Sequence, residues 1–262
     1  MIGYNALGRN GRLGNQMFQY AALKGIAAYR GYEYCLPPQE FEPPEHHLLF
    51  DIFEMSSVKY IQRMPQDPTI GDGHFHFNEN LLRTCPDNVN LIGYFQTEKY
   101  FLHIADDIKK DFTFKQDIQQ KAKEYLDKIS AGDKICLSVR RGDYLSYPDH
   151  HPVCTLEYYE QALSRFDNSM HVIIISDDKE WVSQQTLFNG DRFHITDSDF
   201  HFSVDLCVAS MIDNHIISNS TFGWWGAWLS NKKQVIAPLK WFGIANSHVN
   251  TKDLIPSDWE RI

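Results

Sequence analysis

The chain has 262 residues, 43% hydrophobic and 23% charged, which is the composition of a soluble globular protein with one large or two small domains. Its formal net charge of −9 argues against the basic face of a nucleic-acid-binding protein, so we expect no nucleic-acid partner. Five scattered cysteines without C-x-x-C spacing are typical of a reducing compartment. No signal-peptide pattern opens the chain, and no apolar run approaches the roughly 20 residues of a membrane span. We therefore expect a cytoplasmic protein.

The first half of the chain predicts few regular elements. Apolar and small residues at helical spacing predict a helix over 16–29. A glycine-bearing turn, GRLGN at 11–15, precedes it and leaves backbone N–H groups free to meet an anion. Prolines make 37–87 irregular, so we expect loops and short helices that shape one wall of a cleft. A strand near 90–94 and a helix from about 98 into the 110s follow.

The second half alternates regularly between helices and apolar strands. We expect helices at 116–129, 156–166, 179–187, 203–212 and 222–229, and strands at 134–139, 171–176, 192–195, 215–218 and 234–237. This alternation is typical of an α/β fold with a parallel sheet covered on both faces. Ligands of such sheets bind beyond the carboxyl ends of the strands. Three polar clusters follow strands there, at 140–141, 177–178 and 218–221, and together they predict a nucleotide site.

The adjacent arginines Arg140 and Arg141 are the strongest single signal. A guanidinium stays protonated and offers a rigid fork of donors that fits phosphate oxygens, so a pair at a strand end favours a phosphate site. The alternative is a structural pairing with Asp143 that ties a loop to the surface.

Four segments of the chain resemble the α-1,2-fucosyltransferases of glycosyltransferase family 11. They are GRLGNQMFQYA at 11–21, GYFQTEKYF at 93–101, VRRGDY at 139–144 and SNSTFGWWGAW at 218–228, in the family's order. The resemblance implies a GT-B architecture, in which two Rossmann-like domains with parallel sheets flanked by helices face each other across a cleft. It places an acceptor-side domain at 1–115 and a nucleotide-sugar domain at 116–262. The well-patterned parallel sheet at the C-terminal end supports the donor half independently.

The same resemblance implies the reaction. L-Fucose would move from GDP-β-L-fucose to the 2-hydroxyl of a terminal β-galactoside, with inversion, without a cofactor and without a metal. The acceptor would be a soluble or lipid-linked glycan, and the enzyme would make peripheral contact with a lipid-linked acceptor. We expect a bacterial or viral protein. Another GDP-sugar donor and a catalytically silent glycan- or nucleotide-binding protein are the alternatives.

The resemblance assigns donor-binding roles in the second half of the chain. Arg140 would contact the β-phosphate, and Arg141 would either make a second phosphate contact or pair with Asp143. Ser138 stands where the family usually carries a histidine that helps to hold guanine, which opens the question of nucleotide preference. Asp177, or Asp178 instead, would accept hydrogen bonds from guanine. The pyrophosphate would lie on the start of the next helix, whose capping is the alternative role of its hydroxyl side chains; the residues are Asn219, Ser220, Thr221 and Phe222.

The catalytic assignments include one residue of the first half. Asn15 and, for donor binding, Arg12 would lie across the presumed cleft, with Asn15 facing the fucose–phosphate bond. An inverting displacement ordinarily uses a carboxylate to take the acceptor proton. Asp143 and Glu98 are the candidates, and a base-free, dissociative mechanism stays open.

Other patterns favour structural roles. The D-x-D at 197–199 is a metal–nucleotide motif of a different glycosyltransferase fold and competes with four segments that point elsewhere. Histidines at 74, 76, 150 and 151 lack the spacing of a metal site, so we expect loop histidines and no bound metal. Trp224, Trp225 and Trp228 are expected in the core, and Asp205 is expected to cap a helix.

Overall fold

The computed structural model describes residues 1–39 and 46–262, and the chain divides into two compact units. The first consists of Met1–Lys115 and Val249–Pro256, and the second of Gln116–His248 and Ser257–Ile262. The segment Val249–Pro256 therefore departs from the sequence division, which placed it in the second domain. Asp253 explains this, because its carboxylate accepts from Lys99 Nζ (2.5 Å) and from the Phe77 N–H (3.0 Å), both in the first unit.

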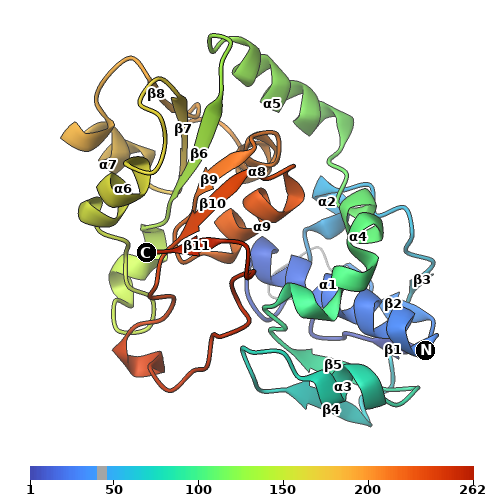
Figure 1. The fold of residues 1–262 in the computed structure, drawn as a ribbon. Helices are drawn as coiled ribbons and strands as arrows, with labels where there is room; N and C mark the ends of the chain where they lie inside the picture. Colours follow the sequence, from blue (N-terminus) through green and yellow to red (C-terminus); the bar gives the residue numbers. More distant parts are fainter. Residues whose placement is uncertain (40–45) are drawn as a thin grey trace. The chain divides into compact units, whose positions relative to one another are not determined.

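The first unit contains a five-stranded parallel sheet in the order β3-β2-β1-β5-β4 (Figure 1). The strands are β1 Ile2–Gly3, β2 Tyr34–Leu36, β3 Tyr60–Ile61, β4 Thr69–Asp72 and β5 Asn90–Gly93. Two short helices, α2 Leu49–Ile52 and α3 Glu79–Thr84, also fall in or near the proline-rich region. The expectation of irregular structure over 37–87 was thus wrong for β3 and β4, and residues 40–45 lie outside the described ones. Strands of two to four residues are too short to show a period of two in the sequence.

Helix α1, Leu13–Arg30, packs along this sheet and confirms the predicted helix with three more residues at its start. It ends at Gly31, whose left-handed backbone (φ 70°) directs its N–H to the carbonyls of Ala27 and Ala28. The helix predicted from residue 98 is instead two 3₁₀ turns, Glu98–Tyr100 and Leu102–Ile104, followed by α4, Ala105–Asp111.

The second unit contains a six-stranded parallel sheet in the order β11-β10-β9-β6-β7-β8. The strands are β6 Lys134–Val139, β7 His171–Ser176, β8 Phe193–Ile195, β9 Asn214–Ile216, β10 Gln234–Ala237 and β11 Glu260–Arg261. Counted from β6, this is the doubly wound order 3-2-1-4-5-6 of Rossmann-type sheets. The order reverses between β6 and β9, and ligands of such sheets bind beyond the strand ends at that point.

Helices cover both faces of the second sheet, as the sequence predicts. The helices α6 Leu156–Leu163 and α7 Lys179–Ser183 lie on the same side of the sheet (Figure 1). They share a buried cluster with Ile135, Leu137 and Val139 of β6. The helix α8 Phe202–Ser210 packs against both α5 Gln116–Asp127 and α9 Thr221–Leu229. Residues alternate between the faces of a strand, so Ser138 points to the other side of β6 from Leu137 and Val139.

The tryptophans of α9 lie in the core, as expected. Trp224 and Trp225 are fully buried and Trp228 nearly so, with the first two rings in edge-to-face contact at 5.0 Å. Residues 1–39 and 46–262 include no helix long and apolar enough to cross a membrane.

Candidate active site

The loops after β6 and β9 meet at the point where the strand order reverses. The two strands pair directly, with Leu137 opposite Ile216. Beyond their ends, the Tyr144 hydroxyl donates to the Asn219 carbonyl at 3.0 Å. Two of the three predicted polar clusters are therefore joined, and the third, at Asp177 and Asp178, is joined to the first by ion pairs.

Arg140 is held between two carboxylates. Its Nη2 pairs with Asp143, its Nη1 lies 2.7 Å from Asp177 Oδ2, and the guanidinium lies over the Tyr144 ring at 5.1 Å. The Nε is buried and has no hydrogen-bond partner among the described residues. The two carboxylates fix the arginine in place. The exposed 18% of its side chain leaves it open to a ligand.

Arg141 is fixed by a different carboxylate from the one that the sequence suggested. Its Nε lies 3.1 Å from Asp178 Oδ2, its N–H donates to Asp177 Oδ1 at 2.9 Å, and its guanidinium lies 3.8 Å from the Trp181 ring centre. The structure thus pairs Arg141 with Asp178 and Arg140 with Asp143. Trp181 carries no motif and was missed.

Asp177 and Asp178 organise the arginines in this structure. Both Asp177 oxygens are engaged, one by the Arg140 guanidinium and one by the Arg141 N–H. Gly142 allows this approach, since a Cβ there would lie 2.3 Å from Asp177 Oδ2. Asp178 also caps α7, accepting from the Trp181 N–H at 3.1 Å. Guanine recognition by either residue stays a prediction.

The segment 219–222 divides between an internal anchor and the start of a helix. Asn219 is buried and its Nδ2 donates to the carbonyls of Pro152 and Trp241, each at 2.9 Å, so its side chain anchors two loops. Ser220 caps α9 by accepting from the Phe222 N–H at 3.3 Å. Thr221 and Phe222 are half-buried and form the first turn of α9. The positive end of this helix therefore lies at the strand-order reversal.

Ser138 lies beneath α9. Its side chain is buried, and a Cβ on Gly223 would come within 2.8 Å of its Oγ. Gly223 thus lets α9 approach β6 closely, and a small residue at 138 fits the same contact.

Burial tunes two aromatic groups beside Arg140. It raises the pKa of Tyr144 to about 12, so the phenol stays protonated and keeps its bond to Asn219. The Tyr144 ring stacks on His151 at 4.9 Å, and burial lowers the pKa of that histidine. The imidazole is therefore neutral at pH 7, and Arg140 and Arg141 carry positive charge in the loop after β6.

Asn15 lies in the first unit at the start of α1. Its Oδ1 accepts from Gln96 Nε2 at 2.9 Å, which ties the first of the four family-like segments to the second. Gly11, at φ +96°, makes room, because a Cβ there would lie 2.0 Å from Asn15 Nδ2. Arg12 is exposed, and Glu98 is half-buried in the 3₁₀ turn that follows Gln96.

The remaining predicted groups have structural surroundings. Asp205 does not cap a helix: His201 caps α8, and Asp205 forms a buried pair with Lys179 at 3.1 Å. Burial raises the pKa of this carboxyl. Neither the D-x-D nor the loop histidines belong to a group of three metal-ligating side chains within the described parts of the chain.

A family comparison decides the assignment that this geometry suggests. The protein-family model described as Glycosyl transferase family 11 matches residues 1–260 of the chain. The chain belongs to glycosyltransferase family 11. The resemblance of the four segments is thus confirmed.

Relatives within the family are named for α-1,2 transfer. The chain is 31% identical to an Escherichia coli protein named alpha-1,2-colitosyltransferase, over 96% of each chain. It is 27% identical to the mouse (Mus musculus) galactoside 2-alpha-L-fucosyltransferase Sec1, over 84% of this chain and 62% of that one.

Solved fucosyltransferase structures share the fold. NodZ alpha-1,6-fucosyltransferase co-crystallized with GDP aligns with a TM-score of 0.59 at 12% identity, over 87% of this chain and 92% of that one. POFUT1 in complex with GDP-fucose aligns with a TM-score of 0.56 at 11% identity, over 88% and 94%. The expected α/β, GT-B-like fold class is confirmed.

Proposed function

We propose that this glycosyltransferase moves L-fucose from GDP-β-L-fucose to the 2-hydroxyl of a terminal β-galactoside, with inversion and without a metal. The acceptor would be a soluble or lipid-linked glycan in the cytoplasm. The single observation that carries the proposal is the cluster of Arg140, Arg141 and the α9 N-terminus at the strand-order reversal of the second sheet.

The chemistry of the leaving group explains the arginines. Breaking the fucose–phosphate bond leaves GDP with an additional negative charge, and fixed donors aimed at that charge lower the barrier. We assign Arg140 to the β-phosphate and the first turn of α9 to the pyrophosphate. The donor thus belongs to the second unit and the acceptor to the first.

Charge balance suggests how donor binding and acid–base chemistry are linked. The cluster holds two guanidinium groups and three carboxylates, Asp143, Asp177 and Asp178. A diphosphate adds negative charge, so one of the two carboxylates paired with Arg140 must move away from the guanidinium when the diphosphate binds. Asp143 is the more exposed of the two Arg140 partners, at 42% against 26% for Asp177. We assign Asp143 as the group released, and as the base that takes the acceptor proton.

A second donor is favoured by a specific observation. The relative that matches 96% of this chain is named a colitosyltransferase. Colitose is L-fucose without its 3-hydroxyl, so a site for one sugar needs little change to take the other. GDP-colitose is therefore the second candidate donor, with the same acceptor hydroxyl.

The test is release of GDP from each GDP-sugar, with and without lactose and with and without EDTA. We expect turnover of GDP-fucose that lactose stimulates and EDTA leaves unchanged. Faster turnover of GDP-colitose would assign the second donor. Binding of GDP without turnover of either sugar would indicate a silent binding protein and contradict the proposal.

A further inference from the structure

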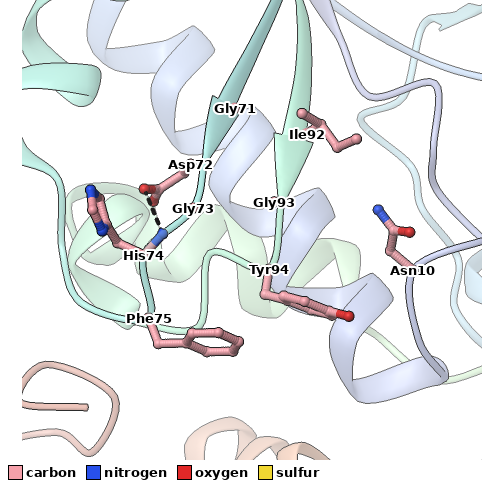
Figure 2. Close-up of a pocket in the computed structure, with 9 residues that line it drawn as sticks. All are labelled: Asn10, Gly71, Asp72, Gly73, His74, Phe75, Ile92, Gly93 and Tyr94. Carbon is pink, nitrogen blue, oxygen red and sulfur yellow. Dashed lines mark hydrogen bonds between the residues drawn. The ribbon is translucent and has the colours of Figure 1, made fainter. Parts of the chain in front are cut away.

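A pocket of about 370 Å³ opens in the first unit at the carboxyl ends of β4 and β5. Figure 2 shows its lining, which comes from these strand ends, from the loop after β4 and from Asn10 before α1. The volume is at the small end of the roughly 300–1,000 Å³ typical of small-molecule sites. It suits one or two sugar rings.

One wall of the pocket is an exposed apolar surface. Phe75 and Tyr94 stack at 5.3 Å with their planes 20° apart. Tyr94 is 39% exposed, and Ile92, two residues earlier in the chain, is 40% exposed (Figure 2). A galactopyranose has one face made of C–H groups, which packs against such a surface without leaving hydroxyls unpaired.

Polar groups lie around this wall. Asp72 is buried, and the hydroxyl of Tyr100 and the N–H of His74 (3.3 Å) both donate to its carboxylate. Burial and the neighbouring Asp72 raise the pKa of Tyr100, which keeps that hydroxyl a donor. The Asn10 amide and the His74 ring add further partners for sugar hydroxyls. The nine lining residues include one carboxylate and no lysine or arginine, so the pocket suits a neutral polyol rather than a diphosphate.

The backbone that shapes the pocket also positions Asn15. Gly93 has φ +151°, and a Cβ there would lie 2.6 Å from the Asp72 carbonyl oxygen, so the loop after β5 can turn only with glycine. Three residues later Gln96 donates to Asn15. On the other side, Asn10 begins the turn that leads to Asn15. The loop after β5 and the turn that begins at Asn10 therefore both lead to Asn15, the residue that the family resemblance assigns to the fucose–phosphate bond.

We propose that this pocket binds the terminal β-galactoside of the acceptor, with Tyr94 and Phe75 against the C–H face of the ring. Hydrogen bonds from the hydroxyls to Asp72 and Asn10 then fix its orientation. The assignment rests on the proposed function for the identity of the sugar. It rests on the pocket's own geometry for the place where that sugar binds.

Three variants of pocket residues test the assignment. Tyr94→Ala removes the exposed ring, and Tyr94→Phe keeps it. Gly73→Val adds an isopropyl group to a residue that lines the pocket. The backbone tolerates this change, because a Cβ at Gly73 meets nothing within 4 Å and Gly73 is not among the positive-φ residues. The matched control is Tyr29→Ala, which removes a tyrosine of similar exposure (48%) from α1 of the same unit.

Binding of lactose is measured by saturation-transfer NMR without donor, and the KM for lactose by GDP release. We expect Tyr94→Ala and Gly73→Val to weaken lactose binding about tenfold or more. We expect Tyr29→Ala to bind lactose as the wild type does, and Tyr94→Phe, which keeps the ring, to bind lactose more tightly than Tyr94→Ala. The KM for GDP-fucose should stay unchanged in all four variants.

The two readouts separate the pocket from the reaction. Lactose binding that the pocket variants abolish, in a protein without turnover, would support the pocket and contradict the proposed function. Normal lactose binding and KM in both Tyr94→Ala and Gly73→Val would overturn the pocket while leaving the function intact. Absence of lactose binding to the folded wild type at any accessible concentration would also overturn it.

Discussion

The replacement Arg140→Ala is the sharpest perturbation of the proposed donor site. It removes the guanidinium that lies 2.7 Å from Asp177 and beside Asp143, and leaves these carboxylates where phosphate is expected to bind. Loss of one preorganised donor to a developing charge typically costs about 10²–10³ in kcat. The exposed carboxylates add repulsion, so we expect a loss at or above the upper end of this range. Arg140→Lys keeps the charge without the fork and should recover only part of the rate.

The same replacement should disturb folding little. Asp143 is 42% exposed, so solvent screens its pair with Arg140, whereas the pair with Asp177 (18% and 26% exposed) is screened less. Exposed ion pairs contribute about 0–1 kcal/mol each, and less when discounted for such screening. The loss of activity should therefore far exceed any loss of stability.

Lactose-stimulated GDP release measures the activity, and thermal unfolding measures the stability. The control is Arg165→Ala, which breaks an ion pair with Glu260 (3.2 Å) in the same unit, where the side chains are 45% and 40% exposed. We expect the control to keep wild-type turnover. If Arg140→Ala stays folded and turns over within tenfold of the wild type, the assignment of Arg140 to the β-phosphate is wrong.

Three further predictions concern named contacts. Gly223→Ala places a Cβ 2.8 Å from Ser138 Oγ and should cost about 1–3 kcal/mol in urea unfolding, part of which Ser138→Ala restores; an unchanged midpoint would contradict the close approach of α9. His215 is buried, which lowers its pKa to about 4. As the pH drops, this histidine therefore takes up a proton in the unfolded chain before it does so in the folded protein. The free energy of unfolding should fall by about 3 kcal/mol between neutral pH and the folded pKa of His215. His215→Gln should flatten this pH dependence, and an equally steep profile in the variant would assign it to other groups. Asp143→Asn should lower transfer to lactose by about 10²–10⁴ while GDP-fucose still binds; transfer near the wild-type rate would exclude Asp143 as the base.

The fold of the second unit could largely be predicted from the sequence. Strands β6, β7 and β10 have the bounds that the apolar runs predict, because a parallel strand buried on both faces is apolar throughout. Three polar clusters at strand ends then had to lie along one edge of the sheet. Their exact partners did not follow: the pairing of Arg141 with Asp178 and the internal role of Asn219 depend on loop conformations that no period encodes.

The strands and the pocket of the first unit were much harder to predict from the sequence. Its strands β1, β2 and β3 have two or three residues each, so they show no period, and their pairing depends on tertiary packing. The pocket at β4 and β5 was missed for a related reason. Glycines and a buried carboxylate shape it, and its aromatic wall forms only when the two loops meet.

The linkage of the product decides whether the protein is an α-1,2-fucosyltransferase. The protein is incubated with GDP-fucose and lactose, and the purified trisaccharide is examined by NMR. We expect an α-anomeric fucose attached to the 2-hydroxyl of galactose. A product with fucose at another position or in the β-configuration would contradict it.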